Sequence, residues 1–291
     1  MKINSLRIFL LTAIACFSFI TSQAHDFEAN GIYYRITNQE TKEIEITFQG
    51  AYYDEYTNRY SGVVNIPSSV TYNGNTYSVT SIGDEAFYGC SGLTSVTIPN
   101  SVTRIGSYAF MNCSGLTSVG FNAENCTRMG SSSSPAFYGC TALSSVIIGE
   151  NVKNIPDYAF FGCSGLTSIT IPNSVISIGN LAFYNCSALT SVTSMNPIPP
   201  TCGSYVFYGV DTNTCKLYVP EGSKEVYSTA DHWKDFMDII DNLAGIEDVI
   251  ADEDADALVE YFNLNGVRIV NPQNGIYIKR QGKKVEKVLI K

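Results

Sequence analysis

Five cysteines recur at regular spacing and are the residues of this sequence most suited to chemistry. They are Cys90, Cys113, Cys140, Cys163 and Cys186, and each follows a phenylalanine by three positions. Such a row of thiols could bind a metal or carry a redox reaction. Disulfides between neighbours are disfavoured, because the number is odd and stacked Cβ atoms would lie about 4.8 Å apart, above the usual ~3.8 Å. The sixth equivalent position holds Val210. We therefore expect a buried structural row of free thiols, with metal or redox chemistry as the alternative.

Two further cysteines, Cys202 and Cys215, stand outside this row and flank Phe207. In an exported protein a disulfide between them could persist. It would close a loop of 14 residues and stabilise the last repeat by about 3 kcal/mol in the loop-entropy model. The sequence therefore allows this disulfide, but spacing alone does not set the pairing.

An enzymatic site has little support in the sequence. The two histidines, His25 and His232, lie outside the repeats, so neither a histidine-based triad nor a zinc site fits within them. Residues 158–210 contain no charged side chain, and the chain has no P-loop or dinucleotide-binding motif. We expect a protein that is not an enzyme and that needs no cofactor.

A calcium loop is also disfavoured. Asp252, Asp254 and Asp256 match the first, third and fifth positions of an EF-hand loop. The sixth position is Ala257 where glycine is needed, and the twelfth is Asn263 where a bidentate glutamate is needed. We expect a solvated linker here and no bound metal.

The cysteines belong to a repeated unit whose elements must position them. Its pattern is I-G-x-x-A-F-x-x-C-x-x-L-x-x-V-x-I-P-x-x-V, and its marker phenylalanines are Phe87, Phe110, Phe137, Phe160, Phe183 and Phe207, at intervals of 23, 27, 23, 23 and 24 residues. Leu, Val and Ile form a short strand that proline ends. One such unit cannot bury its apolar side alone, so the units must stack. We predict a solenoid of about six 23-residue coils with a parallel β-sheet on one face.

The start of the chain has the features of a signal peptide over residues 1–24. Lys2 and Arg7 precede an apolar run over residues 8–20, and Ser22-Gln23-Ala24 fits a cleavage site before His25. No other segment is apolar enough to span a bilayer, so we expect no transmembrane span. A net charge of −9 argues against nucleic acid as a partner.

Different patterns flank the repeats, which are predicted over residues 81–222. Alternating apolar and polar residues predict a β cap over 25–80, in which the loop at 50–62 with four tyrosines serves as a lid or a binding patch. Residues 223–246, with the only tryptophan, form a C-terminal cap. An acidic linker at 247–259 leads to a small β module at 260–291, where Asn-Gly turns indicate hairpins.

Two rows of side chains are candidate ligand surfaces. The strand face carries hydroxyls, above all Thr94, Thr117, Thr167 and Thr190. It can bind a partner by hydrogen bonds, or it can simply reflect β propensity and solubility. A row of large side chains follows the marker phenylalanines at Tyr88, Met111, Tyr138, Phe161, Tyr184 and Tyr208. This row is either an aromatic strip that stacks on sugar rings or a sheath over the core.

The repeated pattern resembles the BspA-like leucine-rich repeats of exported Bacteroidetes proteins. The segment "IPNSVTRIGSYAFMNCSGLTSV" at residues 98–119 carries the resemblance, which extends over about residues 62–222. It implies a leucine-rich-repeat solenoid in a protein that is secreted or held at the bacterial cell surface, and adhesion to host matrix proteins or other cells. The alternative is glycan binding through the aromatic strip. We expect an extracellular protein or glycan as the partner of a monomer. Residues 261–291 resemble type IX secretion sorting domains.

Overall fold

The structure is a computed structural model that describes residues 24–50, 52, 60–241, 259–262, 268–269, 275–281 and 284–290. The predicted signal peptide lies outside these ranges except for Ala24. Most of the tyrosine loop and nearly all of the acidic linker also lie outside them. What the sequence predicts for these segments stays a prediction.

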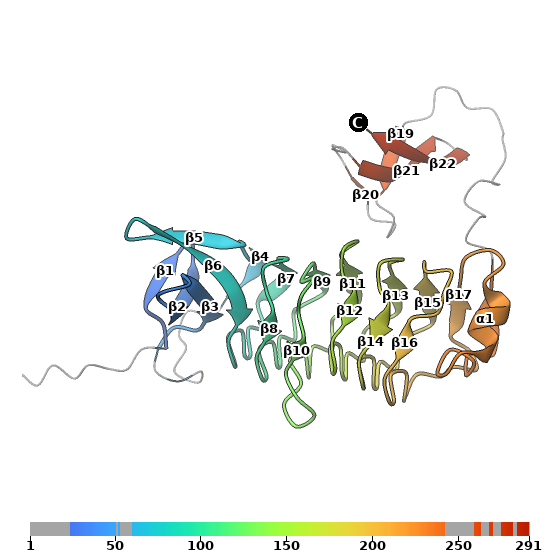
Figure 1. Ribbon diagram of the computed structural model, residues 1–291, viewed down its shortest axis with the longest axis horizontal. Coiled ribbons are helices and arrows are strands. Elements are labelled where there is room, and N and C mark those ends of the chain that lie inside the picture. Colours follow the sequence, from blue (N-terminus) through green and yellow to red (C-terminus); the bar gives the residue numbers. More distant parts are fainter. Residues whose placement is uncertain are drawn as a thin grey trace, which may run out of the picture.

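Each repeat contributes one strand to a long parallel sheet, as its alternating pattern predicts. In the first full repeat, Val96 and Ile98 are buried while Ser95 and Thr97 between them are partly exposed. Figure 1 shows the strands side by side along the molecule, in chain order and with every neighbouring pair parallel. They are β4 (Gly62–Asn65), β7 (Leu93–Ile98), β9 (Ser118–Phe121), β11 (Ser145–Ile148), β13 (Ser168–Ile171), β15 (Ser191–Ser194), β17 (Lys216–Tyr218) and β18 (Asp238–Ile240). The predicted solenoid is confirmed.

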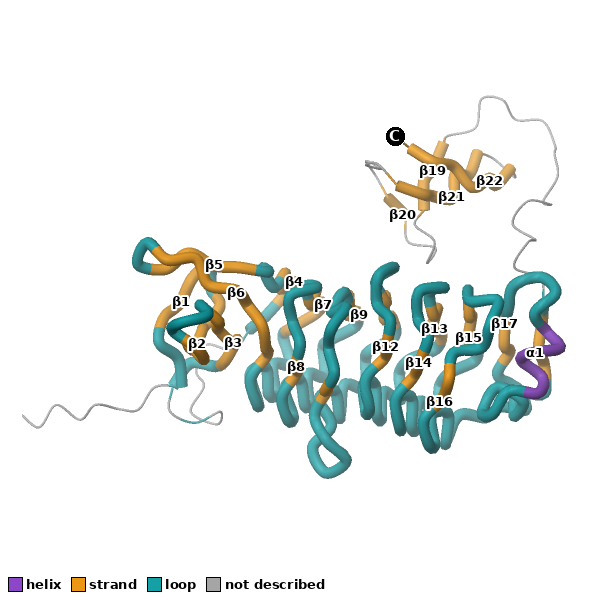
Figure 2. Tube along the Cα trace, in the orientation of Figure 1, coloured by secondary structure: helices purple, strands orange, loops and turns teal. Residues whose placement is uncertain are grey.

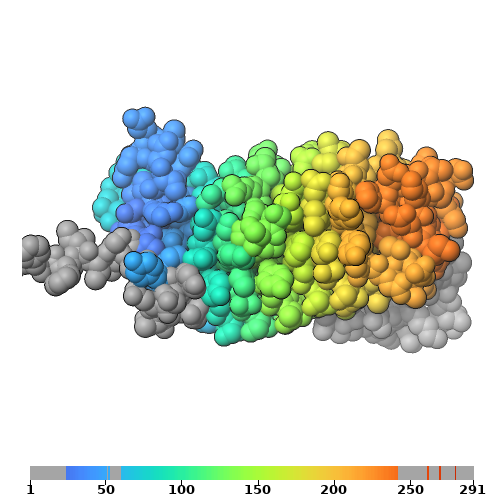
Figure 3. Space-filling view, turned by 90° about the horizontal axis from the view of Figure 1, so that it is seen from below, coloured from blue at the N-terminus to red at the C-terminus, as the bar shows by residue number. Residues whose placement is uncertain are grey.

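A second wall of the solenoid consists of two-residue strands that follow the turn after each long-sheet strand. They are β8 (Arg104–Ile105), β10 (Arg128–Met129), β12 (Asn154–Ile155), β14 (Ser177–Ile178) and β16 (Thr201–Cys202). The third side has no strands and consists of turns, drawn in teal in Figure 2. Figure 3, seen from below, shows the coils as successive bands along the long axis. Each coil therefore has three sides around one core.

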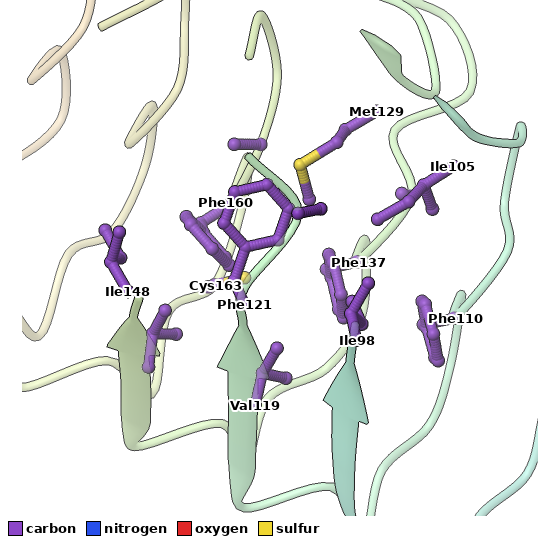
Figure 4. Close-up of a cluster of buried hydrophobic side chains, with 14 of the residues drawn as sticks. Ile98, Ile105, Phe110, Val119, Phe121, Met129, Phe137, Ile148, Phe160 and Cys163 are labelled. Atoms are coloured by element: carbon purple, nitrogen blue, oxygen red, sulfur yellow. The ribbon is translucent and has the colours of Figure 1, made fainter. Parts of the chain in front are cut away.

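The marker phenylalanines stack in a column inside the turns. Their ring centroids lie 4.7 Å apart for Phe87 and Phe110 and 4.6 Å for Phe110 and Phe137. The spacing widens to 5.8 Å between Phe137 and Phe160, where Phe121 meets Phe160 edge to face at 6.4 Å (Figure 4). All of these rings are fully buried. A phenylalanine in each coil thus joins the coils into one continuous core.

The turns place two residues of each coil in the left-handed backbone region, except in the coil of Phe137, where Pro135 holds the first position. The first precedes the Ala-Phe or Val-Phe pair directly and is Glu85, Tyr108, Tyr158, Leu181 or Tyr205, with φ between 53° and 59°. The second directly precedes the cysteine position and is Gly89, Asn112, Gly139, Gly162, Asn185 or Gly209. Glycine and asparagine tolerate this conformation best, which explains their recurrence at the second position.

The row of cysteines is buried, as predicted. None of the five forms a disulfide, and all five are fully buried. The Sγ atom of Cys113 donates to the carbonyl oxygen of Phe87 in the preceding coil at 3.0 Å, and Cys140 does the same to Phe110 at 3.0 Å. Cys186 repeats the contact to Phe160 at 3.3 Å. The thiols therefore link the turns of neighbouring coils.

The predicted disulfide between Cys202 and Cys215 does not form, because both thiols are free. Cys202 belongs to β16 in the second wall, whereas Cys215 directly precedes β17 in the long sheet. The two residues flank Phe207 in the sequence but lie on different sides of the coil. The prediction was wrong because it took the ends of a short segment for spatial neighbours.

The N-terminal end of the solenoid is closed by further strands. They are β1 (Phe27–Ala29), β2 (Ile32–Asn38), β3 (Glu43–Thr47), β5 (Ser69–Tyr72) and β6 (Asn75–Ile82). β3 pairs in parallel with β6, and β6 pairs in parallel with β8, so these strands continue the second wall. Glu45 is buried between Arg35 and Arg104 and forms ion pairs with both. The long sheet already begins at β4, within the segment predicted as a cap.

The other end is closed by α1 (Lys224–Thr229) and β18. Trp233 is fully buried against Phe207, with ring centroids 5.4 Å apart, and its Nε1 donates to the carbonyl oxygen of Pro200 at 2.8 Å. The buried Tyr227 hydroxyl lies 2.6 Å from Ser194 Oγ. These aromatic side chains cover the core of the last coil.

The C-terminal module is a separate antiparallel sheet with the strand order β20-β19-β21-β22. Its strands are β19 (Val259–Phe262), β20 (Arg268–Ile269), β21 (Gly275–Gln281) and β22 (Lys284–Ile290). β21 and β22 pair over their full lengths across a two-residue connection. β19 and β20 form one of the hairpins that the turn residues indicate, whereas β20 and β21, on either side of the Asn-Gly pair at 274–275, do not pair with each other. None of the helices in the described ranges has the length and hydrophobicity that crossing a bilayer requires.

The second wall is interrupted between β10 and β12. In most coils a glycine follows the second-wall strand and donates to the preceding coil: Gly130 N to Ile105 O at 3.0 Å, and Gly179 N to Ile155 O at 2.8 Å. Pro156 holds this position after Ile155 and has no N–H to donate. The wall is therefore broken where one coil has lost this hydrogen bond.

Candidate functional site

The outer face of the long sheet carries two rows of uncharged, mostly small side chains in register. One row contains Ser95, Ser118 and Ser145, and continues with Ser168 and Ser191. The other contains Thr97, Gly120, Ile147, Thr170 and Thr193. From β7 to β15 these ten positions hold no charged side chain and no aromatic ring. The result is a flat, uncharged surface across five strands.

The predicted threonines lie along one border of this face, each exposed and directly before or at the start of its strand. Two of their hydroxyls are used within the fold: Thr117 Oγ1 donates to Thr94 O at 3.0 Å, and Thr190 Oγ1 donates to Thr167 O at 3.1 Å. The same pairs are joined by their backbone N–H groups. These threonines therefore fasten neighbouring coils, and of the four only Thr94 and Thr167 keep their hydroxyls available for a ligand.

The aromatic strip is a stack of rings at its C-terminal half. Phe161 and Tyr184 lie parallel with ring centroids 4.8 Å apart, and Tyr184 and Tyr208 follow at 5.0 Å. Phe161 belongs to the coil before Tyr184 and Tyr208 to the coil after it, so both faces of the Tyr184 ring are covered. A sugar needs a free ring face to stack on, and Tyr184 offers none.

The N-terminal half of the strip is less continuous. Tyr88 and Met111 are half-buried, whereas Tyr138 is 48% exposed. The Tyr138 ring leans over Gly162, where a Cβ atom would lie 3.3 Å from Cδ2. The small residue at Gly162 thus makes room for the ring. In this half the side chains cover the turns of the solenoid.

The interruption of the second wall leaves a hollow of about 440 Å³ beside the broken strands. Glu124, Asn154, Asp157 and Ser177 are among its lining residues. Several of these groups already have hydrogen-bond partners: Ser177 Oγ donates to Asn154 Oδ1 at 2.6 Å, and Asp157 Oδ1 accepts from the backbone N–H of Asn180 at 2.7 Å. Several polar groups that line this hollow are therefore already hydrogen-bonded within the fold.

The described part of the chain contains few groups that could bind a metal or act as a nucleophile. There, no three His, Cys, Asp or Glu side chains come together as a metal site would require. Burial raises the pKa of the Cys186 thiol to about 12 and that of Cys126 to about 11. A thiol with such a pKa stays protonated near neutral pH and is a poor nucleophile.

Sequence reasoning missed one hollow, at the C-terminal end of the aromatic strip. It has a volume of about 420 Å³ and is lined by Tyr205, Tyr208, His232 and Asp235, among others. Tyr205 lies at the same left-handed turn position as Tyr158 and Leu181 in other coils. Its residue type and its place in the repeat therefore gave no indication that it lines a hollow. His232 and Asp235 come from the C-terminal cap, and only the folded cap brings them beside the tyrosines.

The repeats match the family model of the BspA type leucine rich repeat region in six copies, over residues 67–134 and 131–230. Among solved structures, a leucine-rich repeat protein of T. pallidum is 24% identical, covering 63% of this chain and 88% of that one, with a TM-score of 0.42. A leucine-rich repeat protein of Bacteroides capillosus is 28% identical, covering 58% of this chain and 98% of that one, with a TM-score of 0.36.

A leucine rich cell surface protein of Faecalibacterium prausnitzii is 22% identical over 67% of this chain and 70% of its own, with a TM-score of 0.28. No curated protein matches the chain. The family match extends over residues 67–230 and so covers more than half of the chain. The chain therefore belongs to the family of BspA-type leucine-rich repeat proteins.

Proposed function

We propose that this protein is an exported, non-enzymatic binding protein that recognises another protein outside the cell, as an adhesin does. The outer face of the long sheet is the proposed recognition surface. The observation that carries the proposal is the pair of uncharged rows from Ser95 to Ser191 and from Thr97 to Thr193, which lie in register across five strands.

A surface of this kind suits a protein partner for a physical reason. The centre of a protein interface is depleted in charged residues, because a charge that loses its water there must be paired. Charges on this sheet occur only near its C-terminal end, at Lys216 in β17 and Asp238 in β18. Small side chains also let a partner approach the sheet closely over a long, flat area.

The alternative proposal is glycan binding through the aromatic strip. The covered faces of Tyr184 favour protein recognition over this alternative for the interior of the strip. We further propose that the protein acts as a monomer and that the C-terminal module directs secretion or attachment to the bacterial surface. Sedimentation of residues 25–291 and cell fractionation with and without residues 260–291 test these two points.

The main test is a binding screen of residues 25–291 against host matrix proteins and glycans, followed by variants of the sheet face. Ser145→Arg and Ser191→Arg each place a bulky charge on the outer face. We expect at least a tenfold loss of affinity for a matrix-protein ligand from each. Ser187→Arg introduces the same charge at an exposed turn position and serves as the control. Equal affinity in all three variants would overturn the proposed surface.

A further inference from the structure

The hollow at the C-terminal end of the aromatic strip differs from the rest of the strip in having open aromatic surface. Tyr205 is 60% exposed and Tyr208 is 57% exposed. The buried side chains of Phe207 and Val210 contribute to its lining. Its volume of about 420 Å³ lies within the usual range for small-molecule sites, about 300–1,000 Å³.

The two tyrosines stand at right angles, with ring centroids 6.0 Å apart and an angle of 84° between the ring planes. In such a pair the edge of one ring meets the face of the other. Tyr184 covers one face of Tyr208. If the edge of Tyr208 contacts Tyr205, no described ring covers the second face of Tyr208; if the edge of Tyr205 contacts Tyr208, no described ring covers either face of Tyr205. Because both rings are also more than half exposed, aromatic surface is accessible to a ligand in either arrangement.

Polar groups lie beside this face. Asp235 contributes an exposed carboxylate, His232 a half-buried imidazole and Thr212 a hydroxyl. The nearby cation Lys234 is paired with Asp231 at 2.6 Å. The hollow thus combines an aromatic wall with the hydroxyl of Thr212 and with the imidazole and carboxylate of the C-terminal cap.

We propose that this hollow binds a single pyranose ring at the end of a glycan. The C–H face of a pyranose is apolar and weakly positive, so it stacks on the negative face of a tyrosine ring. Its hydroxyls point outward around the ring, where a carboxylate can accept hydrogen bonds and an imidazole can accept or donate them. The site lies at the end of the solenoid and does not require the proposed protein-recognition face, so the two proposals can fail independently.

Trp233 provides a built-in probe for the experiment. It is the only tryptophan of the chain, and its ring packs against Phe207, which lines the hollow. Methyl glycosides of glucose, galactose, mannose and N-acetylglucosamine are titrated into residues 25–291 while tryptophan fluorescence is followed. Isothermal calorimetry measures the affinity independently. We expect saturable binding of at least one methyl glycoside.

Variants assign the binding to the hollow. Tyr205→Asn and Tyr208→Ala each remove a ring, and Asn tolerates the left-handed conformation at position 205. Paired together, these changes remove the aromatic wall, and we expect about a tenfold or greater loss of affinity. Asp235→Asn should weaken binding as well. Tyr138→Ala removes an exposed tyrosine elsewhere on the strip and should leave the affinity unchanged.

Three results would overturn the proposal. The first is that no methyl glycoside binds at concentrations up to about 50 mM. This is about 50 times a Kd of 1 mM, which already corresponds to a very weak site. The second is unchanged affinity in the Tyr205→Asn, Tyr208→Ala double variant. The third is binding of choline chloride without any glycoside, since two tyrosines and a carboxylate would then form a cation site. Circular dichroism of each variant confirms that it is folded.

Discussion

Pro156 stacks directly against Gly179, one residue after the paired strands β12 and β14. Gly179 donates its N–H to the preceding coil and has no room for a side chain, because a Cβ atom there would lie 2.4 Å from Asp157 N. Pro156 has neither property. Its ring and its missing N–H together keep the coil from closing against β10, and the second wall is split at this point.

Exchanging these two residue types should therefore have unequal effects. Gly179→Pro removes the hydrogen bond to Ile155 O and places a ring where Asp157 N lies, so we expect a loss of about 3 kcal/mol or more in the free energy of unfolding. Pro156→Ala should cost no more than about 1 kcal/mol, since no hydrogen bond is lost. Urea denaturation of the two variants measures the difference, and similar losses in both would contradict this explanation of the split wall.

The buried thiols predict a fall in stability at alkaline pH. Burial raises the pKa of Cys186 from 9.0 to about 12, so the folded state keeps this proton at pH values where the unfolded state loses it. The contribution is fully present below pH 9 and is lost as the pH rises toward 12, at about 1.4 kcal/mol for each pKa unit. Cys186→Val, which copies the residue found at Val210 in the last coil, should reduce the slope between pH 9 and 11. An unchanged slope would mean that other groups cause it.

The threonines on the border of the long sheet should differ in their effect on stability. Thr190→Val keeps the shape of the side chain but removes the hydrogen bond from Oγ1 to Thr167 O, and we expect a loss of about 0.5–1.5 kcal/mol. Thr94→Val is the matched control, because within the described residues its hydroxyl donates no such bond. Thermal unfolding followed by circular dichroism compares the two. Equal losses would argue that β propensity alone explains the threonines.

The stacked rings of the strip predict which tyrosines matter for folding. Tyr184 packs between Phe161 and Tyr208, so Tyr184→Ala should lower the free energy of unfolding by about 1–2 kcal/mol. Tyr138→Ala removes a ring that is half exposed and for which the structure shows no ring partner among the described side chains, so a smaller loss is expected. Chemical denaturation of both variants tests this order. The reverse order would contradict a structural role for the stack.

The repeated part of the fold could be predicted from the sequence, because each local pattern recurs in every coil. Phe110 and Cys113 are buried, and the strand at Leu93–Ile98 has its apolar residues inside, as their spacing requires. The position before the cysteine could also have been read as a turn, since it is always glycine or asparagine. Repetition makes a weak local pattern reliable, since a single repeat alone would leave its register open.

The contacts between different parts of the chain could not be predicted. Spacing placed Cys202 near Cys215, but the path of the coil takes them to different walls. The hollow beside Tyr205 depends on His232 and Asp235, which reach it through the fold of the C-terminal cap. Pro156 can be read directly from the sequence, but its effect on the second wall could be inferred only by comparing it with the glycines at the same position in neighbouring coils.

The described thiols have a consequence for how this protein responds to a reducing agent. None of the eight cysteines that the structure describes forms a disulfide, and the thiols of Cys113, Cys140 and Cys186 donate to carbonyl oxygens of the preceding coil. The solenoid thus reaches its native contacts without any covalent crosslink. A reducing agent such as dithiothreitol should therefore leave the fold of the described residues unchanged.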